Sequence, residues 1–361
     1  MEKEKKRRNT FFQASLKLLI GIGGIAALLS ALLCAVCPFI NPSVFVWTAI
    51  FGLAFWMIFF VNVLILIILI YLKSRRTLLI PIVALLFSIP GLMKSYSLGE
   101  EKDGDAQIKV MTYNVGVFRD YNDENRYASD VKKSLAKLVK EENPDVLCLQ
   151  ESGKWPNSTA SAFSQMIGYK YYSVNKTNGN SYFSKYPLQD VNAFDNEGLK
   201  KFVDIKKVKI NNKDSFYLAN YHLNSFRISD DIDDINEKEV YKSVIEKLVN
   251  GFMSRAKITK LLLNNMPDDN LPLVICGDFN DTPLSYTYNE MKNAGLKDAF
   301  LTASAGIGKT YCGKLPLLRI DYFWYNDYVE VISYKRIKQT TSDHYPLVMD
   351  FNINKGVEEK E

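Results

Sequence analysis

The sequence has few of the residue types that build zinc sites and disulfide frameworks. It contains two histidines and five cysteines among 361 residues. Outside the apolar N-terminal region, the cysteines are Cys148, Cys276 and Cys312, an odd number without the close spacing of zinc ligands. We therefore expect no disulfide framework, and a zinc centre is disfavoured.

The larger part of the chain also lacks an excess of either charge. Residues 1–105 carry 11 Lys and Arg against 6 Asp and Glu, which accounts for the whole net charge of +5 (11 − 6). Residues 106–361 carry 34 of each (45 − 11 and 40 − 6). A globally basic nucleic-acid-binding surface is therefore not indicated. The five lysines within 200–209 can contact phosphate backbones locally, and the competing interpretation is a solvated strand face.

Three long apolar runs near the N-terminus contain almost no charge. They predict membrane spans at about 16–37, 44–72 and 77–93, because about 20 apolar residues cross a bilayer core of about 30 Å. A cleaved signal peptide is disfavoured for the first run, since no small-residue cleavage site follows it. We therefore expect an integral membrane protein with a three-helix transmembrane region.

Basic residues at the ends of these runs predict the orientation. They cluster at 5–8 and 73–76, and the loop between the first two runs has none, so both clusters are expected in the cytoplasm. With three spans, the N-terminus is cytoplasmic and the rest of the chain after the third span is extracytoplasmic. The third run is short and contains Pro81 and Pro90. If it is re-entrant or interfacial, the domain stays inside the cell.

The remaining chain predicts one globular domain. We divide the sequence into an anchor at 1–94, a polar linker at 95–106, a domain at 107–354 and a charged tail at 355–361. Roughly ten short strands and a few amphipathic helices in about 250 residues predict an α+β fold with two packed sheets flanked by helices. No internal repeat is visible.

The stretch 271–283, LPLVICGDFNDTP, joins a strand to a polar rim. Its apolar run from Leu273 to Cys276, bounded by Pro and Gly, is typical of a buried strand. Asp278 and Asn280 lie two apart, so an extended backbone points both side chains to one side. Such a pair can hold a hydroxyl or water and a phosphate oxygen. The competing interpretation is an Asx-type turn that only caps backbone N–H groups.

Polar residues follow other apolar strands in the same way, and both histidines are among them. These residues are Asn114, Glu151, His222, Asp321, Asp343 and His344. If the strand ends meet on one rim, they supply hard oxygen ligands, two imidazoles and amide donors. These groups are the ones that magnesium-assisted attack of water on phosphate requires, whereas zinc prefers more His and Cys ligands.

Together these motifs resemble those of the endonuclease/exonuclease/phosphatase superfamily over about residues 107–352. The matching segments are TYN (112–114), QE (150–151), GNSYFSKYPL (179–188), YHL (221–223), GDFND (277–281), TY (310–311), RIDY (319–322) and SDH (342–344). The resemblance implies a four-layered α/β sandwich. It also implies a phosphoesterase that depends on Mg²⁺, with Mn²⁺ as an alternative.

The resemblance assigns the metal and the attacking water to five residues. It implies Glu151 as the principal Mg²⁺ ligand, with Asn114 and Asp343 beside the metal. It implies that His344 binds or activates the attacking water and that Asp321 orients the ring of His344.

The substrate is assigned in the same way. The resemblance implies that Asp278 and Asn280 position the nucleophile and the scissile phosphate, and that His222 binds the phosphate or the leaving group. Some members of the superfamily orient this histidine with a carboxylate, but GNSYFSKYP offers only Ser181 and Ser184 near the expected place. The partner of His222 is therefore left open.

Residues 225–254 look like an insertion that follows His222. We expect this segment to flank the active site, and the competing interpretation is a surface helix packed elsewhere. The leading function is a membrane-anchored phosphodiesterase of nuclease type. The alternative is the same chemistry on a lipid headgroup or small phosphoester, and an inactive binding module is disfavoured because every catalytic position is filled. The expected partners are the phosphoester substrate and the membrane, and no protein partner is predicted.

Overall fold

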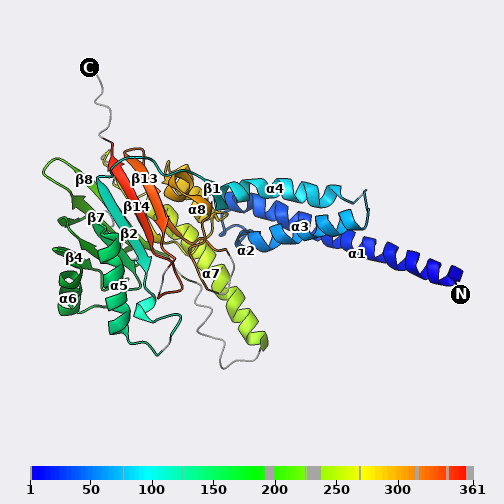
Figure 1. The fold of residues 1–361 in the computed structure, drawn as a ribbon, viewed down its shortest axis with the longest axis horizontal. Coiled ribbons are helices and arrows are strands. Elements are labelled where there is room, and N and C mark those ends of the chain that lie inside the picture. The colour runs from blue at the N-terminus through cyan, green and yellow to red at the C-terminus, as the bar shows by residue number, and fades with distance from the viewer. Residues whose placement is uncertain are drawn as a thin grey trace, which may run out of the picture. The chain divides into compact units, whose positions relative to one another are not determined.

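The computed structural model gives the fold shown in Figure 1. It describes residues 2–75, 77–123, 125–191, 199–223, 225, 237–267, 270–313, 317–338 and 341–354. The chain falls into two compact units. We call Met1–Lys94 with Pro283–Asn289 the helical unit, and Ser95–Thr282 with Glu290–Glu361 the sandwich unit.

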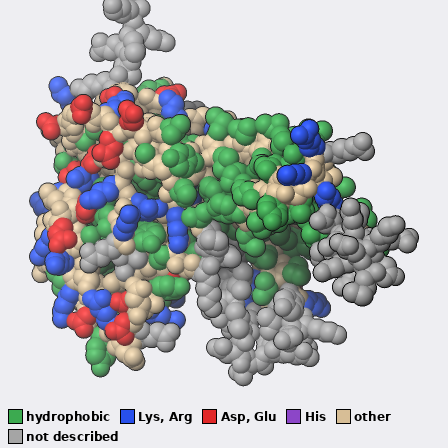
Figure 2. Space-filling view, turned by 45° about the vertical axis from the view of Figure 1, so that its right-hand side comes forward, with side chains coloured by type: hydrophobic (Ala, Val, Ile, Leu, Met, Phe, Trp, Pro, Cys, Tyr) green, Lys and Arg blue, Asp and Glu red, His purple; other side chains and the backbone are tan. Residues whose placement is uncertain are grey.

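Apolar helices make up most of the helical unit. They are α1 (Glu2–Val36), α2 (Trp47–Leu53), α3 (Phe55–Tyr71) and α4 (Leu79–Ser95). Many of their apolar side chains are exposed, including Leu19, Ile22, Phe60 and Leu64. Figure 2 shows such side chains gathered over this unit. A small buried centre contains Cys34, Phe55 and Leu284.

The helices differ in their ability to cross a membrane. Among the described residues, the stretch Ser15–Phe39 is long and apolar enough by itself. The second predicted span is broken, because α2 and α3 meet at a bend of 68° and reach the required length only together. The third predicted span, α4, has 17 residues with Pro90 inside it and is shorter than the length usually needed.

Two six-stranded sheets form the sandwich unit. The first has the order β13 (Val329–Arg336), β14 (Leu347–Ile353), β2 (Ile108–Asn114), β3 (Val146–Gln150), β5 (Ser181–Ser184) and β4 (Tyr171–Val174). The second has the order β10 (Lys297–Asp298), β12 (Asp321–Tyr325), β9 (Leu273–Asp278), β8 (Ser215–His222), β7 (Val203–Lys209) and β6 (Leu188–Asp190). The helices of this unit are α5 (Ala128–Glu142), α6 (Asn157–Ile167), α7 (Glu237–Leu263) and α9 (Ala299–Ala303), and α8 (Tyr286–Asn293) is divided between the two units.

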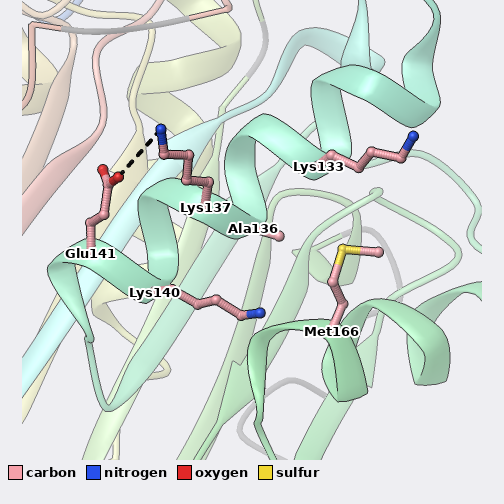
Figure 3. A pocket seen from close by; sticks show the side chains of 6 residues that line it. All are labelled: Lys133, Ala136, Lys137, Lys140, Glu141 and Met166. Atoms are coloured by element: carbon pink, nitrogen blue, oxygen red, sulfur yellow. Dashed lines mark ion pairs between the residues drawn. The ribbon is translucent and has the colours of Figure 1, made fainter.

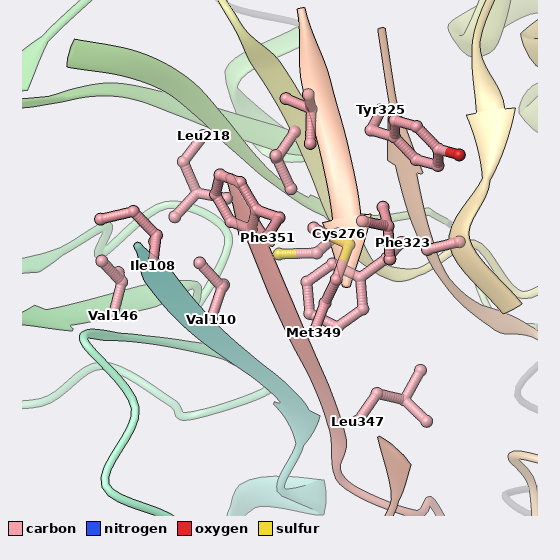
Figure 4. Close-up of a cluster of buried hydrophobic side chains, with 14 of the residues drawn as sticks. Ile108, Val110, Val146, Leu218, Cys276, Phe323, Tyr325, Leu347, Met349 and Phe351 are labelled. Carbon is pink, nitrogen blue, oxygen red and sulfur yellow. The ribbon is translucent and has the colours of Figure 1, made fainter. Parts of the chain in front are cut away.

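Apolar side chains fill the space between the sheets and the space outside the first sheet. The inter-sheet core shown in Figure 4 includes Val110 of β2, Leu218 of β8, Phe323 of β12 and Met349 of β14. A second core joins the first sheet to α5 and α6. The two mixed sheets flanked by helices confirm the predicted α+β sandwich.

The predicted linker and the lysine-rich segment differ from what the sequence indicated. Tyr96–Leu98, inside the predicted linker, forms the strand β1, which pairs with β11 (Ala305–Ile307). Lys206 in the lysine-rich segment is 5% exposed and forms ion pairs with Asp190 and Asp204, so this side chain lies on neither a solvated face nor an open basic surface. The tail at 355–361 and most of residues 224–236 lie outside the described residues.

Candidate active site

The strand register brings the predicted polar residues together. In the first sheet, β2 and β3 run parallel and pair Asn114 with Gln150, so Glu151 follows beside Asn114. In the second sheet, β8 and β9 run parallel and pair His222 with Asp278. The carboxyl ends of each parallel pair meet at one edge of their own sheet. Asn114 Nδ2 on the first sheet lies 3.0 Å from Asp278 Oδ2 on the second, so these side chains share one rim.

Two antiparallel strands complete the rim. β12 begins at Asp321, which is paired with Asp278 at the end of β9. β14 pairs with β2, and the residues before β14 place His344 in an isolated bridge with Tyr311. The polar residues predicted from six separate strand ends therefore lie within one site.

His344 and Asp321 form a buried pair. The Nδ1 atom of His344 lies 3.0 Å and 2.9 Å from the two carboxylate oxygens of Asp321. Its Nε2 atom lies 3.7 Å from Asp278 Oδ2. Burial alone would lower the pKa of His344, but attraction to Asp321, Asp278 and Asp343 raises that pKa to about 10.

Asp278 is a buried carboxylate held by two amides. Its side chain accepts hydrogen bonds from Asn114 Nδ2 at 3.0 Å, from Asn280 Nδ2 at 3.0 Å and from the Asn280 backbone N–H at 2.8 Å. Burial raises the pKa of Asp278 to about 6, although His344 and His222 oppose the rise. The second N–H of the Asn280 amide donates to the Leu223 carbonyl at 2.9 Å.

The predicted proximity of Asp278 and Asn280 is correct, but the stated reason is wrong. The strand ends at Asp278, and Asn280 has a left-handed backbone with φ of 52°. The Asn280 N–H bonds the Asp278 carboxylate, which is the Asx-type turn considered as the competing interpretation. The turn itself therefore brings the two side chains together.

Glu151 is the partner of His222 that the sequence left open. The Nε2 atom of His222 lies 3.2 Å from Glu151 Oε1, and Asn114 Nδ2 donates to the same oxygen at 3.2 Å. Burial alone would raise the pKa of Glu151, but His222, Asn114 and His344 lower it to about 2. Burial likewise opposes the charged form of His222, but Glu151 and Asp278 raise its pKa.

Neither serine near the expected place takes that role. Ser181 Oγ lies 2.6 Å from Ser152 Oγ, and Ser184 Oγ accepts the Tyr186 backbone N–H at 2.9 Å. The pairing of His222 with a residue on the opposite sheet was invisible in the sequence, because it depends on how the two sheets face each other.

Asp343 lies at the edge of the site beside an aromatic residue to which the sequence assigned no role. Its side chain is 33% exposed and has an oxygen 4.0 Å from His344 Nε2. Burial, together with the negative charge of Asp343, raises the pKa of Tyr311, whose ring centroid lies 5.3 Å from that of His344. Tyr311 belongs to the TY motif noted in the sequence, but no role was predicted for it. It is the functional candidate that sequence reasoning missed.

A second group of side chains to which the sequence assigned no role lies buried next to the site. Gln150 Nε2 donates to Thr112 Oγ1 at 2.9 Å and to Asn220 Oδ1 at 2.6 Å. Asn220 Nδ2 donates to the Leu149 carbonyl at 3.1 Å. These side chains are buried and connect β3 to β8, so they hold the two sheets together next to Glu151 and His222. A polar Asn inside the apolar run of β8 was the available signal.

The donor set fits a hard divalent cation. Asp278, Asp321 and His344 each offer a ligand atom, and these atoms lie within 4.8 Å of one another. Both oxygens of Asp321 already bond His344, whereas Glu151 is 33% exposed and ionised, so Glu151 is the more accessible ligand. Four carboxylates, counting Asp343, gather in one site, and a cation would offset their mutual repulsion.

Asn114 is oriented differently from the predicted metal ligand. Its Nδ2 faces the carboxylates of Glu151 and Asp278, and its Oδ1 accepts the Gly116 backbone N–H at 3.1 Å. In this arrangement Asn114 donates hydrogen bonds to the two carboxylates.

A hollow elsewhere on the surface lacks this chemistry. It has a volume of about 470 Å³ and lies between α5 and α6, as Figure 3 shows. Its lining residues are Lys133, Ala136, Lys137, Lys140, Glu141 and Met166. Lys133 is paired with Asp130 at 3.0 Å and Lys137 with Glu141 at 3.8 Å. None of the residues at the strand ends lines it, so we place the candidate site at the strand ends.

The chain belongs to the Endonuclease/Exonuclease/phosphatase family. The family model matches residues 111–344, which is more than half of the chain. Members of this family are hydrolases that act on phosphoesters and typically depend on a divalent metal ion. A second model, described as a domain of unknown function (DUF8431), matches residues 16–95. No match was found among curated proteins.

Several solved structures are similar to this chain. The catalytic domain of human Nocturnin with bound sulfate is 20% identical, with 69% of this chain and 94% of that chain covered and a TM-score of 0.49. An endonuclease/exonuclease/phosphatase from Bacteroides vulgatus is 18% identical, with 68% and 98% covered and a TM-score of 0.47. The 3′ phosphatase NExo from Neisseria, bound to a product DNA hairpin, is 19% identical, with 68% and 99% covered and a TM-score of 0.45. The family membership rests on the family model alone.

Proposed function

We propose that this protein is a membrane-anchored phosphodiesterase of nuclease type that depends on Mg²⁺ or Mn²⁺. The observation that carries the proposal is the buried His344–Asp321 pair beside a second buried carboxylate, Asp278. A histidine fixed through Nδ1 presents Nε2 to the site, where it can take a proton from water. The surrounding carboxylates and amides are the groups expected around a phosphate under attack.

Glu151, Asn114 and Asp343 would hold the cation, Asn114 after its amide turns to present Oδ1. When bound, the cation supplies Lewis-acid stabilisation of the charge that develops on the phosphate and, as a positive charge near His344, favours the neutral imidazole. Asp321 keeps the Nδ1 proton of His344 in place and so leaves Nε2 as the base.

Two residues would contact the substrate. Asn280 would exchange its hydrogen bond to Asp278 for one to a phosphate oxygen, while its bond to the Leu223 carbonyl keeps the amide oriented. His222, whose protonated form Glu151 stabilises, would donate to a phosphate oxygen or to the leaving group.

The apolar helices favour a second candidate substrate class. The helix stretch Ser15–Phe39 supports attachment to a membrane, where lipid headgroup phosphodiesters are concentrated. The burial of Lys206 in ion pairs removes one argument for a basic hairpin that contacts nucleic acid. We keep nucleic acid as the first class to test and the lipid headgroup as the second.

The test uses the purified full-length chain in detergent or lipid nanodiscs with Mg²⁺. The substrates are single- and double-stranded DNA, RNA, phosphatidylinositol, sphingomyelin and bis-p-nitrophenyl phosphate. We expect His344→Ala to lose about 10² to 10⁴ in rate as a lost base. Glu151→Gln should lose most of the activity through weaker metal binding. Tyr172→Phe, on the edge strand β4, is the control that should retain activity.

Three results would contradict the proposal. Full activity in excess EDTA would remove the metal requirement, and an unimpaired His344→Ala would remove the base. If the metal-loaded wild type cleaves none of the substrates, the binding-module interpretation replaces the enzyme.

A further inference from the structure

Arg255 on α7 is a fully buried arginine beside the GDFND segment. It is 0% exposed, and its Nε atom lies 3.4 Å from Asp281 Oδ2. Its guanidinium carbon lies 4.9 Å from the centroid of the Phe252 ring on the same helix. Burying a guanidinium is costly unless a negative partner accompanies it, and Asp281 supplies that partner with a side chain that is 7% exposed.

Asp281 is also held by β12, the strand next to β9 in the same sheet, and by its own turn. Its backbone carbonyl accepts the Tyr322 hydroxyl of β12 at 2.8 Å, and its Oδ1 accepts the Thr282 backbone N–H at 3.2 Å. Asp281 is therefore held by β12 through its backbone carbonyl and by α7 through its side chain.

The anchored turn carries the two groups that the proposed reaction needs. Asn280 has a left-handed backbone, which is unfavourable for residues other than Gly unless the surroundings hold it. The turn places the Asn280 amide 3.0 Å from Asp278 Oδ2. A small change in the direction of the chain at Asp281 would move this amide away from the phosphate position.

We propose that Arg255 is a positioning residue for Asp278 and Asn280 and acts through Asp281. The inference rests on the proposed phosphoester hydrolysis at this site. Arg255 holds the turn from its buried side, and its charge also attracts Asp278. Arg255 lies on α7 one residue past the predicted insertion at 225–254, so this helix contributes to the site by fixing the catalytic turn.

The kinetic test compares wild type with Arg255→Met and Arg255→Lys, using bis-p-nitrophenyl phosphate and Mg²⁺. We expect Arg255→Met to lose about 10²-fold in kcat with little change in KM, because displacement of about 1 Å at a reacting group costs about this much. Arg255→Lys keeps the charge but loses the planar fork, so it should recover only part of kcat.

A double-mutant cycle tests whether the effect passes through Asp281. Asp281→Asn should lose kcat as Arg255→Met does, and the double variant should lose little more than either single variant. Additive losses would contradict a shared route. The controls on the same helix are Thr259→Val, which keeps the shape of a buried residue, and Leu262→Ala, which destabilises the helix packing without removing a charge.

Backbone hydrogen exchange gives a readout that does not depend on turnover. A peptide covering residues 277–284 should exchange faster in Arg255→Met than in wild type, and at the wild-type rate in Thr259→Val. If the wild type proves inactive, the proposed function fails, and exchange still reports whether Arg255 holds the turn.

Besides additive losses in the double variant, two outcomes would overturn the inference. One is a folded Arg255→Met variant with wild-type kcat and wild-type exchange at 277–284. The other is a loss of kcat in Leu262→Ala as large as that in Arg255→Met at equal loss of stability, because the effect would then be general destabilisation. If Arg255→Met does not fold, Arg255→Lys and Asp281→Asn carry the same comparison.

Discussion

Glu151 and His222 stabilise each other's charged forms in the metal-free protein. Burial opposes both charges, yet their contact of 3.2 Å lowers the pKa of Glu151 to about 2 and raises the pKa of His222. A carboxylate that is already ionised needs no deprotonation before it binds a cation. The pair therefore prepares Glu151 for the metal-binding role that we propose for it.

The pH dependence of stability in the metal-free protein should report on His344. Its pKa is about 10 in the folded chain, against about 6.5 in the unfolded chain. A group whose pKa rises on folding contributes stability that is complete below its unfolded pKa and is lost as the pH rises through its folded pKa. We therefore expect Tm in EDTA to fall from about pH 6.5 to about pH 10.

Comparison with His344→Gln isolates this contribution from other titrating groups. The wild type should lose more Tm than His344→Gln over the same pH range. Parallel curves for the two proteins would show that His344 gains no charge stabilisation on folding.

At the scale of residues, the sequence predicted membership of the site better than the contacts within it. Asn114, Glu151 and Asp278 were identified because each lies at the end of an apolar strand and matches a motif of the superfamily. The Glu151–His222 contact joins two different sheets, and no local pattern in the sequence specifies which side chains meet across a sandwich. The same reason explains why Arg255 was missed, since its partner Asp281 is 26 positions away (281 − 255) on another element.

At the scale of elements, a polar contact across the core links the two sheets beside the site. Gln150 of β3 donates to Asn220 of β8 and to Thr112 of β2, and all three are buried. Gln150→Leu would leave the buried Asn220 and Thr112 oxygens without this donor. We expect the free energy of unfolding to fall by about 1 to 3 kcal/mol, measured by chemical denaturation.

The matched control for this prediction is Asn220→Leu. Replacing Gln150 by Leu should cost less in the Asn220→Leu background than in wild type, because one of its two acceptors is already gone. Equal costs in both backgrounds would show that the Gln150–Asn220 contact does not hold the sheets together.

Helices and strands with a clear hydrophobic periodicity were predicted from the sequence, and short or irregular ones were not. The sequence predicts a helix from about Ser129 to Glu141, because Val131, Leu135 and Val139 recur at helical spacing, and the structure has α5 (Ala128–Glu142) there. In contrast, α6 and the short strands β6, β10 and β11 were not predicted. Strands of two or three residues carry too little pattern to be distinguished from loops, and their pairing depends on distant partners.

At the scale of the whole molecule, the helical unit is not continuous in the sequence. It includes Pro283–Asn289, the segment that follows GDFND, and Leu284 packs with Cys34 and Phe55. Gly52 and Gly91 leave room for this contact, since an added Cβ at Gly91 would lie 3.0 Å from Leu284 Cδ2 and one at Gly52 would lie 3.1 Å from the Leu284 carbonyl oxygen. Composition could not predict this grouping, because Leu284 lies 250 positions from Cys34 (284 − 34) and 229 from Phe55 (284 − 55).

In the membrane-anchored protein that we propose, the topology of the helical unit decides which substrates the site can meet. The positive-inside rule applied to the basic clusters at 5–8 and 73–76 places the N-terminus in the cytoplasm and, if α4 crosses the membrane, the sandwich unit outside. The 17 residues of α4 reach about 26 Å at about 1.5 Å each, slightly less than a bilayer core of about 30 Å. A modest local thinning of the bilayer would accommodate this difference.

We therefore expect a fusion of alkaline phosphatase to the C-terminus of the full chain to be active, because this enzyme is active only outside the cytoplasm. A fluorescent protein that matures only in the cytoplasm should stay dark at the same position. Fusions after Ser74, between α3 and α4, are the matched control and should give the reverse pattern. A fluorescent, phosphatase-negative C-terminal fusion would place the site in the cytoplasm, where lipids and nucleic acids of the outer face are out of reach.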